Sequence, residues 1–266
     1  KLIGSDLAEV GINVNYAPVL DIRYADTTPA LASRTFSENQ KKVALLGQTL
    51  IAACHEQAVC ACIKHLPGHG RAAVDPHFHL PIVTQSVKEL EKDFYPFITV
   101  ANQALAGMTG HILFQQIDNK PVTQSAKLIQ EIIRQHIGFN GFLFSDAIDM
   151  HALTGSWQEK TKTCLDAGCD AVCYCKGDAD EMQQVINAAR PLTDEALYRF
   201  EKIKNIFSNT KDQINENGKK LLYDSYVKLT LKAKNPPHDY DAVEVLHQPE
   251  KSDLFFKTNI DRKSVV

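Results

Sequence analysis

The chain has 266 residues, enough for one large domain or two small ones, and an α/β barrel alone uses about 250 residues. Its 44% hydrophobic and 23% charged residues are typical of a folded globular protein and argue against a disordered chain. The net charge of -3 and the isoelectric point near 6.4 give no electrostatic reason to expect nucleic acid or an anionic membrane as a partner.

Short apolar runs alternate with amphipathic stretches along most of the chain. The first residues resemble the end of a helix, and the apolar runs then span 12–20, 59–65, 107–114, 141–145 and 170–175. The amphipathic stretches span 38–57, 87–104, 125–137, 159–168 and 180–190. This alternation predicts βαβ units and a parallel sheet with both faces covered. Residues 194–207 and 217–234 predict two further helices, and we expect a poorly ordered polar tail from Asn235 onward.

Polar side chains gather where the predicted strands end. Asp21 follows the first strand, Lys64 and His65 end the second, His111 lies on the third, and Asp146 ends the fourth. The carboxyl ends of parallel strands form the ligand-binding edge of both barrels and open α/β sheets. We therefore expect the chemistry to collect at this edge.

The cysteines bear on the cellular compartment. Of the seven, Cys60 and Cys62 form one alternating pair in an apolar run, and Cys173 and Cys175 form another. Residues two apart in a strand face the same side, so neither pair easily forms its own disulfide. We expect reduced thiols and, with no signal peptide or membrane-spanning run in the sequence, a cytoplasmic protein.

The histidine-rich segment "IKHLPGHGRAAVDPHFHLP", residues 63–81, has three possible functions. A metal site is disfavoured because Pro67 and Gly68 separate His65 from His69 and no H-E-x-x-H pattern is present, so we predict no metal. A phosphate cradle is disfavoured because the G-x-x-x-x-G-K pattern is absent. A catalytic loop fits best.

In the catalytic interpretation, Asp75 lies two residues before His77 and orients its imidazole. The free ring nitrogen could then move a proton. In "GFLFSDAIDM", Asp146 could attack an electrophilic carbon, or it could cap the next helix. The residues alone leave both roles of Asp146 open.

Several motifs occur together in one order. "KHLPGHG", "DPH", "MTGHILF", "IRQHIGFNGFLFSDAIDM" and "CLDAGCDAV" resemble family 3 glycoside hydrolases, in particular the bacterial β-N-acetylglucosaminidases of muropeptide recycling. The resemblance runs from about Lys1 to Phe207 and implies a (β/α)8 TIM barrel that lacks its first three strands. We accordingly expect a barrel domain over residues 1–208, and a helical extension with a polar tail over residues 209–266.

The resemblance also implies roles for individual residues. Asp146 corresponds to the nucleophile, His77 to the general acid/base and Asp75 to its orienting partner. Three further residues correspond to sugar-binding positions, namely Arg34 in "SRTF", Lys64 and His65. Asp149 matches no catalytic position and is expected at a helix start. No cofactor is implied.

The expected function is that of a retaining exo-β-N-acetylglucosaminidase, which removes terminal N-acetylglucosamine from peptidoglycan fragments by double displacement. The alternatives are a β-glucosidase or glycoside phosphorylase of the same family, an inactive truncated barrel or sugar-binding fragment, and a metal-dependent hydrolase. Two departures from the family bear on activity. Pro76 occupies a position where the family usually has serine. The family also has an aspartate that binds sugar hydroxyls on strands upstream of this point, and the 266 residues do not include those strands.

Overall fold

The computed structural model describes residues 1–208 and 214–232. The chain divides into two compact units, which meet in the sequence at Asp212 and Gln213. The first unit contains the sheet and its helices. The described part of the second unit contains helix α8 (Glu216–Lys232). The polar tail that the sequence predicts from Asn235 onward lies outside the described residues.

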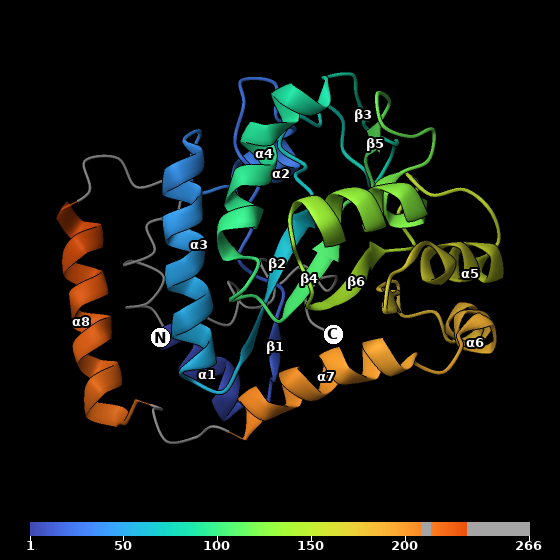
Figure 1. The fold of residues 1–266 in the computed structure, drawn as a ribbon. Helices are drawn as coiled ribbons and strands as arrows, with labels where there is room; N and C mark the ends of the chain where they lie inside the picture. Colours follow the sequence, from blue (N-terminus) through green and yellow to red (C-terminus); the bar gives the residue numbers. More distant parts are fainter. Residues whose placement is uncertain (209–213, 233–266) are drawn as a thin grey trace. The chain divides into compact units, whose positions relative to one another are not determined.

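A five-stranded parallel sheet forms the centre of the first unit (Figure 1). Its strands are β1 (Val14–Asn15), β2 (Cys60–Leu66), β4 (Ala106–Thr109), β6 (Phe142–Ala147) and β7 (Ala171–Cys173), adjacent in that order. Every neighbouring pair is parallel. The sheet curls into half of a barrel, which confirms the predicted α/β barrel class and the predicted parallel sheet.

Helices connect the strands much as the sequence predicts. They are α1 (Leu2–Glu9), α2 (Pro29–Ala32), α3 (Gln40–His55), α4 (Val87–Val100), the short 3-10 helix η1 (Val122–Gln124), the π-helix η2 (Leu128–His136), α5 (Trp157–Ala167), α6 (Ala179–Ala188) and α7 (Asp194–Phe207). Capping side chains in the local sequence determine where several of these helices begin. Asn39 and Thr193 accept backbone N–H groups at the starts of α3 and α7, and Ser156 forms a capping box with Glu159 at α5.

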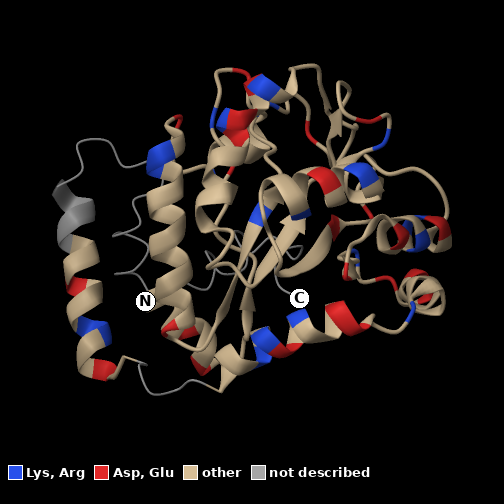
Figure 2. Ribbon diagram, in the orientation of Figure 1, with Lys and Arg blue, Asp and Glu red and all other residues tan. Residues whose placement is uncertain are grey.

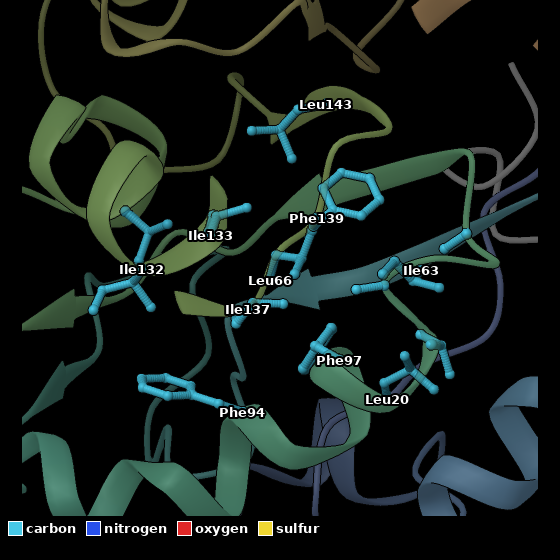
Figure 3. Close-up of a cluster of buried hydrophobic side chains, with 14 of the residues drawn as sticks. Leu20, Ile63, Leu66, Phe94, Phe97, Ile132, Ile133, Ile137, Phe139 and Leu143 are labelled. Carbon is cyan, nitrogen blue, oxygen red and sulfur yellow. The ribbon is translucent and has the colours of Figure 1, made fainter. Parts of the chain in front are cut away.

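The main hydrophobic core lies between the outer face of the sheet and the helices that cover it. Leu66 and Ile63 from β2 pack there with Phe94 and Phe97 from α4 and with Ile133 from η2 (Figure 3). These five side chains are fully buried. Alternation in β2 directs Ile63 outward toward the helices, and Cys62 and Lys64 toward the opposite, concave face. The register of β2 against β4 shifts between Ile63 and Leu66, so Leu66 packs in the same outer core as Ile63 although the two are three residues apart.

Helix α7 closes the other side of the half-barrel. It runs across the N-terminal ends of the strands (Figure 1), where Ala196 and Ile203 join a buried cluster with strand residues such as Cys60 and Phe142. The ring of Phe200 lies 5.8 Å from that of Phe142. Charged residues mark the surface of α7, whereas the strands are largely uncharged (Figure 2). The predicted site residues Lys64, His65 and Asp146 lie toward the opposite, C-terminal ends of β2 and β6.

The predicted strand at 107–114 is in fact two strands. After β4 the chain turns at Gly110, whose N–H donates to the Leu66 carbonyl, and resumes as β5 (Leu113–Phe114). Strand β5 pairs with β3 (Ile82–Val83) in a separate two-stranded parallel sheet. The apolar run continues through the turn because His111 and Ile112 are both buried there, which periodicity alone does not distinguish from a strand. No helix in the described part of the chain is long and apolar enough to cross a membrane.

Candidate functional site

Asp146 lies at the C-terminal end of β6 with 8% of its surface exposed. Its Oδ1 accepts the N–H of Ala147 at 2.8 Å, and its Oδ2 lies 4.0 Å from Nε2 of His65. The register of β6 against β7 shifts between Phe144 and Ala147, which re-aims the strand at this point. Asp146 is not a helix cap, because Ser156 caps the next helix, α5.

Electrostatics favour the ionised form of Asp146. Burial raises the pKa of this carboxyl, but the charges of His65 and His111, the Ala147 N–H and the charge of Lys64 outweigh burial, so that the net shift of the pKa is downward. A buried carboxylate that remains ionised is a competent nucleophile. It is also positioned at the edge of the sheet where ligands bind in barrels.

Strand β2 delivers Lys64 and His65 to the same edge. Nδ1 of His65 lies 2.7 Å from Oδ2 of Asp21, so the imidazole is held between two carboxylates. Burial lowers the pKa of Lys64, whose Nζ lies 5.9 Å from the centre of the Tyr16 ring. The chain passes this point with cis peptide bonds at Lys64–His65 and at Leu66–Pro67.

Asp75 and His77 form the dyad that the sequence predicts. Oδ1 of Asp75 lies 2.7 Å from Nδ1 of His77 and also accepts the His77 N–H at 2.9 Å. Burial raises the pKa of Asp75, but the two hydrogen bonds from His77 and the charges of His77 and Arg34 outweigh it, so the pKa is lowered. The dyad is accessible, because the side chains of His77 and Asp75 are 39% and 24% exposed.

The loop that carries the dyad is attached to the loop that follows Asp146. The N–H of His151 donates to the carbonyl of His77 at 3.3 Å, and the N–H of Ala152 donates to the carbonyl of Pro76 at 3.1 Å. The two candidate catalytic groups are therefore held in neighbouring main-chain segments. Pro76, which departs from the expected serine, serves as an acceptor in this contact and needs no N–H for it.

Arg34 extends the site from the loop after β1. It is exposed, and its Nε donates to the carbonyl of Ala30 at 3.0 Å. Its charge contributes to the lowered pKa values of both Asp75 and Lys64. The structure thus brings Arg34, Lys64 and Asp75 into one electrostatic neighbourhood, although their individual roles toward a substrate remain predictions.

Comparison with known proteins identifies the family. The family model "Glycosyl hydrolase family 3 N terminal domain" matches residues 1–203. The chain belongs to this family. It is 31% identical over 196 residues to a β-hexosaminidase of Idiomarina loihiensis, covering 73% of this chain and 58% of the relative. It is 33% identical over 179 residues to a β-hexosaminidase of Neisseria meningitidis, covering 66% and 49%.

A solved structure supports the same assignment at the level of the fold and the sequence. NagZ from Neisseria gonorrhoeae, crystallised with N-trifluoroacetyl-D-glucosamine, superposes with a TM-score of 0.69 and 26% identity over 83% of this chain and 62% of that chain. The present glycosyl hydrolase family 3 chain spans about half the length of the curated relatives that it matches.

Two buried residues of this family 3 site, Asp21 and His111, form hydrogen bonds within the site that the sequence did not predict. The sequence predicts Asp21 at this edge of the sheet but assigns it no function. In the structure Asp21 is fully buried, and its carboxylate forms a hydrogen bond with the His65 ring. His111 was expected there too, and it supports the segment beyond Asp146, with Nε2 3.0 Å from the Ala147 carbonyl and Nδ1 2.8 Å from Oγ1 of Thr123. The available signals were the position of Asp21 after a predicted strand and the position of His111 within a predicted strand and the "MTGHILF" motif.

The prediction that Asp149 lies at the start of a helix is wrong. Asp149 does not begin a helix but lies in the turn after β6, where its Oδ1 accepts the N–H of Cys175 at 2.8 Å. The segment between β6 and α5 is nine residues long and irregular, so a carboxylate near the end of β6 accepts a hydrogen bond from the segment after β7 instead of capping a helix. Within residues 1–208 and 214–232, no group of three or more His, Cys, Asp or Glu side chains is arranged to hold a metal ion.

Proposed function

We propose that the protein is a retaining exo-β-N-acetylglucosaminidase that acts on peptidoglycan fragments. The observation that carries the proposal is the main-chain contact that joins the Asp75–His77 loop to the segment after Asp146. This contact ties the Asp75–His77 pair to the segment that follows a buried, ionised carboxylate, and it supports the assignment of an acid/base and a nucleophile, the two functions that a retaining glycosidase needs.

In the first step, an oxygen of Asp146 attacks the anomeric carbon while the bond to the leaving oxygen breaks. The imidazolium of His77 gives its Nε2 proton to that oxygen, because Nδ1 is engaged by Asp75. In the second step, Nε2 of His77 takes a proton from water, the water oxygen attacks the anomeric carbon, and Asp146 leaves as a carboxylate. Arg34, Lys64 and His65 would bind the sugar hydroxyls, and no cofactor enters the reaction.

The substrate class is supported by the relatives and not by a pocket in this structure. The curated relatives bear the name β-hexosaminidase, and the NagZ structure contains an N-acylated glucosamine. We infer from these names that the sugar is N-acetylglucosamine. The proposal that peptidoglycan fragments supply it rests on the resemblance of the sequence motifs to enzymes of muropeptide recycling. The seven unpaired cysteines support a reducing compartment, consistent with the cytoplasm.

The deciding experiment measures release of 4-nitrophenol from 4-nitrophenyl N-acetyl-β-glucosaminide by the 266-residue chain. Asp146→Ala should abolish turnover, because the nucleophile is lost, and the glucosyl analogue should be a poor substrate. His77→Ala should slow substrates with poor leaving groups more than the nitrophenyl glycoside, since only the former need a proton. Equal slowing of both would exclude His77 as the acid. Phosphate consumption during turnover would identify a phosphorylase, and no turnover of any glycoside would refute the proposal.

Localisation has its own measurement. Fractionation of cells, followed by immunoblotting, should recover the protein with cytoplasmic markers, and a predominantly extracellular protein would contradict the proposed compartment.

A further inference from the structure

Asp21 is fully buried and receives three N–H groups. They come from Nδ1 of His65 at 2.7 Å, from the backbone of His69 at 2.6 Å and, at a longer 3.4 Å, from the backbone of His65. Burial raises the pKa of Asp21, but the charges and hydrogen bonds of His65 and His69 outweigh it, so the pKa is lowered. Asp21 is therefore a carboxylate that only accepts hydrogen bonds.

This fixes the state of one ring nitrogen of His65. Because an ionised carboxylate cannot donate, Nδ1 of His65 must carry the proton in the 2.7 Å contact with Asp21. The other nitrogen, Nε2, then points toward Asp146, whose Oδ2 lies 4.0 Å away. Asp21 and Asp146 thus lie at opposite nitrogens of one imidazole, and the gap at Nε2 is too long for a direct hydrogen bond.

The neighbouring histidine does not compete for this position. The ring of His69 lies 5.6 Å from that of His65, and burial followed by the charge of His65 lowers the pKa of His69 to about 4. His69 is consequently neutral near pH 7. Only its backbone N–H contacts Asp21.

We propose that Asp21 is a positioning residue for the nucleophile, acting through His65. It fixes the ring orientation and the proton on Nδ1, so that Nε2 is presented to Asp146 and to the sugar that Asp146 attacks. The proposal rests on the proposed function of Asp146. A purely structural role is the alternative, because Asp21 also anchors the "PGHG" turn through the backbone of His69.

A double-mutant cycle separates the two roles. Asp21→Asn keeps the shape of the side chain but removes the charge. It should lower kcat/KM for the nitrophenyl glycoside about 100-fold, mainly through kcat, as expected for a misplaced reacting group. In a His65→Gln background the same change should cost less than about threefold, because the residue through which Asp21 acts is gone. A loss of equal size in both backgrounds would assign Asp21 to the turn and overturn the proposal.

Asp93→Asn is the matched control. Asp93 is also a buried carboxylate, with Nε of Arg71 at 2.7 Å, and its Cβ lies 3.1 Å from the position of a Cβ built on Gly68 of the same turn. Burial raises the pKa of Asp93, so a neutral amide is a mild replacement. This variant should change kcat/KM less than about threefold. A loss matching that of Asp21→Asn would show that the turn tolerates no change, and would count against positioning.

Nitrogen-15 NMR of the His65 ring tests the geometry without any turnover. The resonances are assigned by their loss in His65→Gln. In the wild-type chain, Nδ1 of His65 should be protonated near neutral pH, whether or not Nε2 also carries a proton. A bare Nδ1 overturns the proposal. If the wild-type chain hydrolyses no glycoside, the proposed function fails, while this spectrum still decides whether Asp21 positions His65.

Discussion

Gly70 is the position where the structure predicts the sharpest effect of one added methyl group. It ends the "PGHG" turn that follows β2, and its carbonyl accepts the hydroxyl of Thr27 at 2.6 Å. A Cβ built at this position would lie 1.9 Å from the carbonyl oxygen of Ile22, the residue next to Asp21. The clashing atoms belong to the backbone, so no side-chain rotation can relieve the overlap.

The size of the effect follows from this distance. Ordinary contact begins near 3.4 Å, so Gly70→Ala forces the turn and the Ile22 segment apart by about 1.5 Å. Overpacking of this kind typically costs about 1–3 kcal/mol of folding free energy, and more where the backbone must move. A misplacement of about 1 Å can reduce turnover about 100-fold. We therefore expect a loss of at least 2 kcal/mol, and a loss of kcat/KM of about 100-fold in the molecules that remain folded.

Urea unfolding followed by circular dichroism measures the stability, and nitrophenol release measures kcat/KM. Gly11→Ala is the control, because Gly11 has a φ of +78° but no atom within 4 Å of its built Cβ. It should cost about 1–2 kcal/mol through backbone strain and leave kcat/KM unchanged. If Gly70→Ala behaves like Gly11→Ala in both assays, the close approach between the turn and Ile22 does not exist as described.

Three further predictions concern charge and protonation. Asp170→Ala removes the carboxylate that pairs with Arg134 and Arg199 and should cost about 3–5 kcal/mol in urea unfolding, whereas a loss below about 1 kcal/mol would contradict it. The pKa of Asp75 is lower in the folded chain than its usual value of 3.8, so the ionised carboxylate stabilises the fold. This stabilisation is fully present at pH values above 3.8 and is lost as the pH falls through the pKa of the folded state. The unfolding free energy should thus fall less steeply with acid in Asp75→Asn, and equal slopes would refute this. Burial raises the pKa of Cys175 to about 11, so its alkylation by iodoacetamide should be slow in the folded chain by mass spectrometry, and rapid modification would argue otherwise.

Much of the fold follows from local sequence. Helix α7 begins and ends at the predicted residues because Thr193 supplies a cap whose oxygen accepts the Ala196 N–H, and the acidic residues after it favour a helix start. The strands follow from apolar runs between helices. By contrast, the single strand predicted at 107–114 breaks at Gly110, because a tertiary hydrogen bond to Leu66 overrides the local pattern.

The site was predictable where spacing in the sequence determines contact. Asp75 and His77 lie two residues apart, and their dyad could be expected from the sequence alone. The partnership of Asp21 with His65 could not, because 44 residues separate them and parallel strand pairing brings them together. The sequence left Asp146 with two roles, and the absence of a helix directly after β6 removes one of them.

The attachment of the Asp75–His77 loop through main-chain atoms has a consequence for how the protein could vary in sequence and move. His151 and Ala152 hold His77 and Pro76 by peptide N–H groups, so the exposed side chain of His151 can change to any residue but proline without removing the hydrogen bond, whereas Ala152 is buried. Releasing the loop requires breaking two hydrogen bonds, each worth about 0.5–1.5 kcal/mol net. These two bonds break at modest energetic cost, which in the proposed mechanism would let a leaving group depart between the two chemical steps and the Asp75–His77 loop return to the same position.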